Sequence, residues 1–516
     1  MSTNSIIILV AFVAYMGMMI LIGALNSKQS NNEDYFLGGR GLGSWTAALS
    51  AQASDMSGWL LMGLPGAIYV AGTGEVWIAI GLLIGTILNW FLVARRLRKY
   101  TIVANNSLTI PSFFENRFHD KKGILKLVSS IIVIVFFAVY TASAFASGAK
   151  LFANVFGTGA EDNTAYTVGL IIAAVVILVY TLLGGFKAVC YTDFIQGLLM
   201  LVAILAVPII AYIGIGGDME GALANAPTPV ADPAGFLSLM KDGEGNPITL
   251  VSVISNLGWA LGYFGMPHIL VRFMAIKSDK EVKKSRIIAI VWVILSLGAA
   301  SFLGLVARGF LTEDLIASGK SEVVFIKTIQ QIFNGNVLLV FIGGIFLCGI
   351  LAAIMSTADS QLLVTASAVS EDMYKGVIKK NASEKSALNV GRIAVVVVAV
   401  FAFIIALNPN SSVMGLVSDA WAGFGAAFGP IILLSLFWKR FNLAGAAAGM
   451  ITGFATVIIW DYIPFSGETL YAKTGLYSLV LGFALALIAA VVFTLVTKKP
   501  SAEIEEEFDK VKSVEI

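Results

Sequence analysis

Apolar residues follow one another along nearly the whole chain in long stretches, and short polar loops separate these stretches. A helix needs about 20 mainly apolar residues to cross the hydrocarbon core of a bilayer. The pattern therefore predicts thirteen membrane-spanning helices. Their approximate bounds are 6–25, 44–70, 75–95, 126–156, 164–185, 188–215, 249–275, 286–311, 337–371, 387–407, 411–438, 442–463 and 474–497.

Two of the predicted spans are interrupted by polar residues, glycine and proline. The second contains the polar string 50–58 and then Gly63-Leu-Pro-Gly66, and the seventh contains several glycines and Pro267 within 256–268. Unwound helices at matching places in two halves mark the binding site of many secondary transporters. The alternative is that glycine and proline are simply more frequent in membrane helices than in soluble ones.

The two interrupted spans lie five spans apart, so spans 2–6 and 7–11 form two five-helix units of opposite orientation. We therefore expect an all-α polytopic membrane protein with a five-plus-five inverted-repeat core, in which the first helix of each repeat is broken. The predicted division is a peripheral helix with an inner loop at 1–43, the first repeat at 44–215, an extracellular loop at 216–248, the second repeat at 249–440, two peripheral helices at 441–497 and a cytoplasmic tail at 498–516.

The basic residues predict the orientation of these spans, because loops on the cytoplasmic side carry an excess of Lys and Arg. With the N-terminus outside, 28 of the 34 basic residues fall on the inner side and 6 on the outer side. We therefore expect an external N-terminus and a cytoplasmic C-terminus. The six outer residues are Lys150, Lys241, Arg308, Lys320, Lys327 and Lys473.

Composition excludes several classes of function. Only 13% of the 516 residues are charged and 58% are hydrophobic, which exceeds the apolar share of soluble proteins. The net charge of +2 does not indicate a nucleic-acid partner. Two cysteines and two histidines form no disulfide framework and no paired-histidine metal motif, and a phosphate-binding ATPase loop is absent. We expect neither an enzyme nor a bound cofactor.

Ionisable residues inside a span are costly and indicate function. Asp55 lies in the break of the second span, where it could couple a cation or merely cap the helix that follows. Asp193 lies near the inner end of the sixth span, where it could instead be an interfacial charge. Arg40 follows two glycines and is either a solvated loop charge or part of a gate at the cytoplasmic mouth.

The ninth span carries hydroxyl groups close together. Ser356 and Thr357, a carbonyl from Ala353 and two carbonyls from the second-span break would supply five oxygen ligands. Oxygen-only ligation of low charge suits sodium better than a transition metal. The alternative is that both hydroxyls bond to carbonyls of their own helix. Asp359 and Ser360 follow at a spacing that can share a face with Ser356.

Aromatic residues flank both breaks. Trp59, Trp259 and Tyr263 could together form an apolar wall for a small ring, and Tyr140 in the fourth span is a weaker candidate. Each of these residues could equally be ordinary packing. His268, which follows Pro267, is more simply explained as a hydrogen-bonded structural residue than as a proton relay.

These residues resemble the sodium/solute symporter family, and within it the bacterial sodium/proline symporters. The resemblance runs from about residue 30 to 500 and is most specific in Ser54-Asp-Met-Ser-Gly-Trp59. Further strings that carry it are Leu37-Gly-Gly-Arg40, Trp259-Ala-Leu-Gly-Tyr-Phe-Gly-Met-Pro-His268, Leu351-Ala-Ala-Ile-Met-Ser-Thr357 and Asp419-Ala-Trp-Ala-Gly-Phe-Gly-Ala-Ala-Phe-Gly-Pro430.

The resemblance implies roles for particular residues. Sodium would be bound by the carbonyl oxygens of Ala53, Met56 and Ala353 and by the hydroxyl groups of Ser356 and Thr357. Asp55, Arg40 and Asp193 match positions that take part in coupling. The implied proline pocket comprises Ser57, Trp59, Gly63, Tyr140, Trp259, Tyr263 and Pro267.

The sequence departs from the family pattern at a few positions. Met266 stands where glutamine is expected, and Gln52 stands where glycine is usual. Asp359 and Ser360 replace smaller or neutral residues, so they could form a second cation site or hold a proton. The methionine at position 266 bears on which solute the protein prefers to bind.

The resemblance therefore implies sodium-coupled uptake of L-proline across a bacterial cell (inner) membrane, with sodium as co-substrate and no nucleic-acid or obligate protein partner. Three alternatives remain open at this point. They are sodium symport of another small solute such as an osmolyte, sugar acid or vitamin, an ion channel, and a membrane-bound enzyme.

Overall fold

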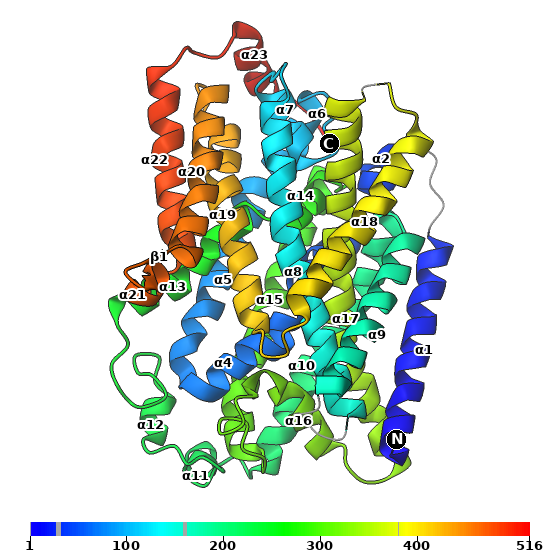
Figure 1. Ribbon diagram of the computed structural model, residues 1–516, viewed down its shortest axis with the longest axis vertical. Coiled ribbons are helices and arrows are strands. Elements are labelled where there is room, and N and C mark those ends of the chain that lie inside the picture. The colour runs from blue at the N-terminus through cyan, green and yellow to red at the C-terminus, as the bar shows by residue number, and fades with distance from the viewer. Residues whose placement is uncertain (1, 27–31, 158–162, 380) are drawn as a thin grey trace.

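The computed structural model describes residues 2–26, 32–157, 163–379 and 381–516. It is an elongated bundle in which the long helices run along the long axis, and the two chain ends lie toward opposite ends of the molecule (Figure 1). The long single helices are α1 (Thr3–Leu25), α8 (Ile124–Phe156), α9 (Asn163–Leu183), α10 (Phe186–Gly214), α15 (Asp279–Phe310), α17 (Val337–Ser367), α18 (Glu384–Ala406), α19 (Val413–Phe437), α20 (Leu443–Tyr462) and α22 (Ser478–Val496).

A further helical stretch runs from Trp59 to Val103 and changes pitch along its length. With it, the described residues contain 11 helices long and apolar enough to cross a membrane. The prediction of an all-α polytopic membrane protein is confirmed, and the count of thirteen spans stays a prediction. The segments of this stretch are η2 (Trp59–Gly63), α4 (Leu64–Ala71), η3 (Gly72–Glu75), α5 (Val76–Leu88), η4 (Asn89–Val93) and α6 (Ala94–Val103).

Both predicted breaks are present. In the second span, α3 (Ser44–Asp55) stops and η2 begins at Trp59 after three residues. In the seventh span, α13 (Leu250–Gly258) tightens into the 3₁₀ segment η5 (Trp259–Phe264), and α14 (Pro267–Met274) starts after Gly265 and Met266. Proline suits the first turn of α14 because the N–H that it lacks has no partner within a helix there. These half-helices are each too short to span a bilayer alone.

Helix α17 is the central helix of the bundle. Every residue from Leu347 to Ser367 is buried, and a helix that is buried on all sides must lie among other helices. It packs against α3, α8 and α10, while η5 packs against α5 and α19. The hydroxyl-bearing part of α17 therefore faces the half-helix that ends at the first break.

The remaining elements are short and connect the long helices. They are α2 (Asn32–Leu37), η1 (Gly38–Arg40), α7 (Ile110–Arg117), α11 (Met219–Ala224), α12 (Pro233–Phe236), η6 (Ser321–Val323), α16 (Val324–Ile332), η7 (Ala368–Ile378), α21 (Leu470–Thr474), α23 (Ala502–Lys510) and the antiparallel strands β1 (Pro464–Phe465) and β2 (Glu468–Thr469), with Pro464 opposite Thr469.

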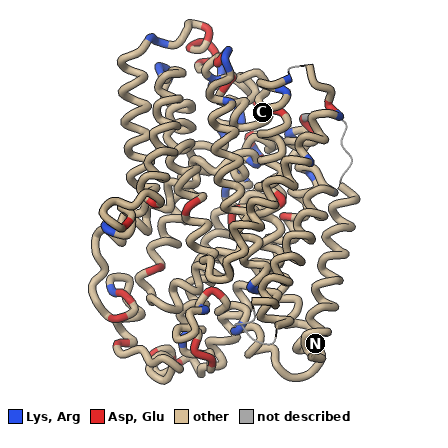
Figure 2. Tube along the Cα trace, in the orientation of Figure 1, with Lys and Arg blue, Asp and Glu red and all other residues tan. Residues whose placement is uncertain are grey.

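Charge is distributed unevenly along the long axis. Figure 2 shows Lys and Arg gathered toward the end where the chain finishes, with few near the end where it starts. The predicted orientation of the loops stays a prediction, and Lys28 and Lys380 lie outside the described residues. The division into peripheral segments, two repeats and a tail stays a prediction.

Candidate functional site

The first break releases a backbone carbonyl. In an unbroken helix the Ser57 N–H would donate to the Ala53 oxygen four residues earlier. Met56 has a ψ of 73°, however, and the Ser57 N–H donates to the Asp55 oxygen at 2.9 Å. A side chain at Gly58 would collide with Ser147, so glycine permits this close approach to α8. The Ala53 oxygen is therefore available to groups on another helix.

The hydroxyl pair of α17 meets this oxygen. Ser356 Oγ donates to the Ala53 oxygen at 2.7 Å, and Thr357 Oγ1 lies 3.5 Å from it. Ser356 Oγ also lies 2.8 Å from the oxygen of Ala352 and 3.3 Å from that of Ala353, so the expected bonding within its own helix occurs as well. Four of the five predicted sodium ligands thus lie together.

Met56 is the fifth predicted sodium ligand. It lies in the same break, three residues after Ala53, and is fully buried. No hydrogen bond joins it to α17 within the described part of the chain. The structure therefore places Met56 near the group without a direct link to it.

Asp55 connects both breaks. Its backbone oxygen accepts hydrogen bonds from Trp59 Nε1 at 3.0 Å and from the Tyr140 hydroxyl at 3.2 Å. Its carboxylate accepts one from the Tyr263 hydroxyl at 2.6 Å, and the other carboxylate oxygen has no partner among the described residues. The carboxylate does not cap the helical segment that follows, so the simpler alternative for Asp55 is not what the structure shows.

Two of the three residues predicted to form an aromatic wall, Trp259 and Tyr263, both meet Trp421. The Trp259 ring stacks on Tyr477 with centroids 5.3 Å apart and on Trp421 at 6.3 Å. The Trp421 indole donates to the Trp259 oxygen at 2.8 Å and meets Tyr263 edge-on at 5.0 Å. Trp421 and Tyr477 thus support the wall, and only Trp421 lies in a string that the sequence analysis singled out.

The other predicted pocket residues lie in different elements of the fold. The Ser57 hydroxyl lies in the first break, 3.4 Å from the Trp59 N–H. Pro267 begins α14, and the next residue, His268, packs edge-on against Tyr140 with ring centroids 6.1 Å apart. The ring of His268 is fully buried, and its part as a hydrogen-bonded structural residue stays a prediction. Gly63 lies farther out, against Met414.

Asp193 is a buried partner of an arginine rather than an interfacial charge. Its carboxylate accepts from the Ser50 hydroxyl at 2.6 Å and pairs with Arg272 at 3.2 Å, and both charged side chains have no exposed area. Arg272 also donates to Ser360 Oγ at 2.5 Å and to the His268 oxygen at 2.8 Å. Arg272 therefore joins α14 to α3, α10 and α17.

Sequence reasoning missed Arg272, which it counted among the basic residues at inner helix ends. Its position four residues after His268, one helical turn along α14, gave no sign that the side chain would be buried. Ser360 and Asp359 lie beside this arginine. Ser360 Oγ donates to the Ser356 oxygen at 2.7 Å and lies 3.3 Å from Asp359 Oδ1. The predicted sodium group and the arginine network are thus directly connected.

Arg40 closes the basic end of the molecule. Its guanidinium donates to Thr101 at 3.0 Å and to the backbone oxygens of Met274 and Ser107 at 2.9 Å each. Gly38 and Gly39 have positive φ, and Arg40 itself has a φ of 51°, which is uncommon for a residue with a side chain. The buried Arg40 thus ties the segment before α3 to the end of α14 and is not a solvated loop charge, and its role in a gate stays a prediction.

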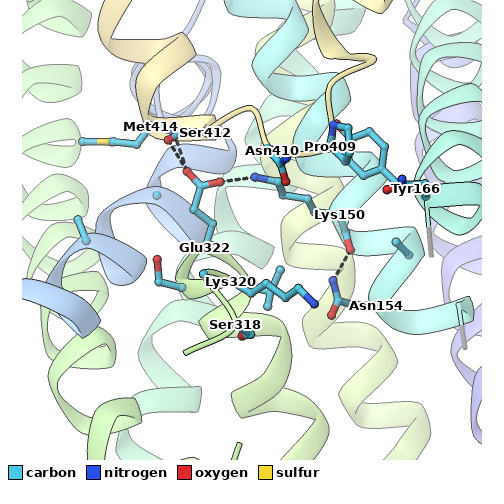
Figure 3. Close-up of a pocket in the computed structure, with 17 residues that line it drawn as sticks. Lys150, Asn154, Tyr166, Ser318, Lys320, Glu322, Pro409, Asn410, Ser412 and Met414 are labelled. Atoms are coloured by element: carbon cyan, nitrogen blue, oxygen red, sulfur yellow. Dashed lines mark hydrogen bonds and ion pairs between the residues drawn. The ribbon is translucent and has the colours of Figure 1, made fainter. Parts of the chain in front are cut away.

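The opposite end contains a cavity of about 640 Å³, which Gly63, Lys150, Tyr166, Lys320, Glu322 and Met414 help to line (Figure 3). Glu322 bonds to Lys150 at 2.5 Å, to Ser412 at 2.8 Å and to the N–H groups of Val413 and Met414 at 3.1 Å. Burial raises the pKa of Glu322, but Lys150 and these N–H groups lower it more, so its pKa is below the ordinary value.

Of the predicted pocket residues, Gly63 alone is among those that line this cavity, since the aromatic side chains around Asp55 are almost fully buried. The basic end is closed by Arg40, and the cavity approaches the first break from the other end.

Comparisons with known proteins agree with this geometry. The osmoregulated proline transporter OpuE of Bacillus subtilis is 44% identical over 498 residues, covering 96% of each chain. The sodium/proline symporter of Salmonella typhimurium is 43% identical, covering 97% of this chain and 95% of the relative. A solved Na⁺-coupled sialic acid symporter in a substrate-bound outward-open state has the same fold, with a TM-score of 0.73, 20% identity and coverage of 96% and 98%.

The family model described as the sodium:solute symporter family matches residues 35–453, which include both breaks, the hydroxyl pair of α17 and the arginine network. Because this match covers most of the chain and the relatives align over nearly their whole length, the protein belongs to the sodium:solute symporter family.

Proposed function

We propose that this protein takes up L-proline together with sodium by alternating access, with no covalent chemistry. One observation carries the proposal, which is that the two breaks and α17 meet in one place. The Ala53 oxygen, which the first break frees, meets Ser356 and Thr357. Asp55, two residues later, bonds to Tyr263 of the second break. The printed names of the relatives support proline as the solute. The proposed location is a bacterial cell membrane, with the N-terminus outside and the C-terminus in the cytoplasm.

The proposed sodium ligands are all oxygens. Carbonyls of Ala53, Met56 and Ala353 and hydroxyls of Ser356 and Thr357 provide low-charge, hard ligation, which suits an alkali ion. In the structure Ser356 donates to Ala53. With sodium bound, both oxygens would point their lone pairs at the ion, and the Ser356 hydroxyl hydrogen would turn away. Sodium would thereby fix the position of the break relative to α17.

The proposed solute site uses the same break. The helical segment that begins at Trp59 directs the positive end of its dipole toward the first break, where it would attract a carboxylate. Tyr140, Trp259 and Tyr263 would contact the proline ring. Because sodium and solute would order the same segment, each would raise the affinity for the other by the same factor. The membrane potential adds about 2.3 kcal/mol per charge per 100 mV to the sodium gradient.

Replacing Thr357 by alanine should raise the sodium concentration that gives half-maximal uptake by about tenfold, which corresponds to about 1.4 kcal/mol. The hydroxyl lies 3.5 Å from the Ala53 oxygen and is a proposed ligand, whereas among the described residues no hydrogen bond joins it to the aromatic wall. Initial rates over a range of sodium concentrations test this. Thr365→Ala is a matched control farther along α17, and an equal effect of both changes would contradict the assignment.

Replacing Trp259 by alanine should raise the proline concentration for half-maximal uptake by about tenfold, with a smaller effect on sodium. The ring stacks on both Trp421 and Tyr477, so its removal would loosen the wall that contacts the solute. Rates measured against proline at saturating sodium test the change. A larger effect on the sodium dependence than on the proline dependence would remove Trp259 from the solute site.

A second cation could bind beside Arg272. Asp193 pairs with the Arg272 guanidinium, and Ser360, which accepts from the same guanidinium, lies 3.3 Å from Asp359 Oδ1. One oxygen of each carboxylate has no partner in the described chain. With both acids ionised, the group has one uncompensated negative charge, which a sodium ion or a proton could balance. Asp359 and Ser360 are the proposed ligands.

Asp359→Asn should therefore lower the number of cations moved per proline and change the pH profile of uptake. Reversal potentials measured with purified protein in vesicles give this number. An unchanged number and an unchanged pH profile would leave the second site without support.

Three experiments separate the proposal from its alternatives. Excess unlabelled proline that leaves uptake of another sodium-driven solute unchanged would indicate a different substrate. Counterflow of labelled solute, in which internal solute accelerates entry, requires a binding step and excludes a channel. Conversion of a solute without net movement would indicate an enzyme.

A further inference from the structure

The last residues of the chain are folded against the basic end of the molecule. In and just after α23, Ile504, Phe508 and Val511 are 8%, 5% and 3% exposed, and their spacing places them on one face of a helix. The same segment contains five acidic residues. Figure 1 shows α23 lying across the end of the bundle, near α6 and α7. The tail is therefore a docked amphipathic segment.

Polar contacts hold α23 on both sides. Glu507 contacts His119 Nε2 at 3.0 Å, and Asp509 contacts Lys439 Nζ at 2.6 Å. The hydrogen bond with Asp509 raises the pKa of Lys439, and the same bond lowers the pKa of Asp509. The Phe508 ring lies 5.1 Å from the guanidinium of Arg96 and 5.5 Å from that of Arg117. The docking surface thus combines an aromatic anchor with complementary charges.

The residues that receive the tail belong to separate parts of the bundle. Arg96 lies on α6, Arg117 ends α7 ahead of α8, and Lys439 follows α19. The tail then continues to Ile516, whose carbonyl accepts a hydrogen bond from the Asp279 N–H at 3.1 Å at the start of α15. The segment therefore crosses from the first predicted repeat to the second.

Asp279 also belongs to the contacts that close this end. Its carboxylate lies 2.6 Å from Arg95 and 3.3 Å from Lys99, both on α6. Close by, the Leu42 N–H donates to the Ala275 oxygen at 3.1 Å, and Arg40 bonds to Met274. The tail thus contacts α6, the end of α7, the start of α15 and the residue that follows α19, all at the end that these contacts hold together.

We propose that residues 501–516 form a strap that holds this end of the transporter closed, and that detaching the strap speeds opening there. Exposed ion pairs such as Lys439–Asp509 stabilise a structure only weakly and are screened by salt. The strap is consequently far easier to detach than the buried contacts of Arg40 or Arg272. The inference rests on the proposed function only in the experiment that measures proline uptake.

Charge reversal tests the strap in the full chain. Lys439→Glu and Asp509→Lys should each raise the maximal rate of proline uptake by about threefold, which corresponds to about 0.6 kcal/mol lost from the closed state. The half-saturating concentrations of sodium and proline should not change. The double variant should recover most of the wild-type rate. Single variants that match or fall below the wild-type rate, or a double variant without recovery, would overturn the strap.

A distance measurement tests the strap without transport. Spin labels at K122C on the bundle and K510C on α23, two exposed positions outside the ion pairs between tail and bundle, should show one distance at low salt and an added longer-distance population at high salt; the protein's own Cys190 and Cys348 are buried. A distribution that salt leaves unchanged would contradict a detachable strap. If wild-type vesicles take up no proline, the proposed function fails while this measurement still decides the inference.

Discussion

Asp55→Ala is expected to reduce sodium-driven proline uptake to the level of empty vesicles, a loss of at least about 100-fold. The carboxylate is fully buried and lies two residues from the Ala53 oxygen that meets Ser356. Without it, no negative charge in the first break would balance a sodium ion in a medium of low dielectric constant, where an uncompensated charge is very costly. Uptake of labelled proline by purified protein in vesicles measures the loss.

Two control variants separate the charge of Asp55 from its hydrogen bond. Asp55→Asn keeps the shape and removes the charge, so it should lose nearly as much activity as Asp55→Ala. Tyr263→Phe removes the 2.6 Å hydrogen bond to the carboxylate and keeps the charge, so it should retain measurable sodium-driven uptake. Near-normal sodium dependence in Asp55→Asn would remove the carboxylate from the cation site.

Arg272→Gln is expected to destabilise the protein by about 3–5 kcal/mol, because it leaves the Asp193 carboxylate buried without its ionic partner. It also removes donors to Ser50, to Ser360 and to the His268 oxygen, so the ends of α3 and α14 would no longer be held to α17. Thermal unfolding of the purified protein in detergent should show a markedly lower midpoint, together with loss of uptake.

A double variant that also changes Asp193, the ionic partner of Arg272, identifies the cause of the lost stability. Asp193→Asn combined with Arg272→Gln removes both charges and should recover part of the unfolding midpoint, since an amide can accept from Ser50 without a buried net charge. If the double variant is no more stable than Arg272→Gln alone, the destabilisation does not come from the unpaired carboxylate.

Much of the fold could be predicted because bilayer thickness imposes a long apolar pattern. The two breaks could also be predicted, because glycine, proline and polar residues interrupt two apolar segments at matching positions. The exact number of spans could not be derived, because α3, α13 and α14 are short half-helices and the stretch from Trp59 to Val103 continues from a half-helix into the next span. Hydropathy does not show where one crossing ends and another starts in such a stretch.

The chemical part of the site was predicted unevenly. Asp55, Ser356 and Thr357 stand out because polar groups are rare in apolar spans, and the structure places the Ala53 oxygen beside the hydroxyl pair. Arg272 was missed because a basic residue near an inner helix end looks like an ordinary cytoplasmic charge. Its burial follows from the shortness of α14, which starts deep in the bundle at Pro267. Burial depends on packing between distant segments, and no local pattern reveals it.

The central claim is that sodium and L-proline share the site formed by the first break and α17. The most direct test is uptake of labelled proline by the purified protein in vesicles, with an inward gradient of either sodium or potassium. With sodium, proline should accumulate transiently above its external concentration, and a negative internal potential should increase the accumulation. Equal uptake with both ions, or no accumulation with sodium, would contradict the account.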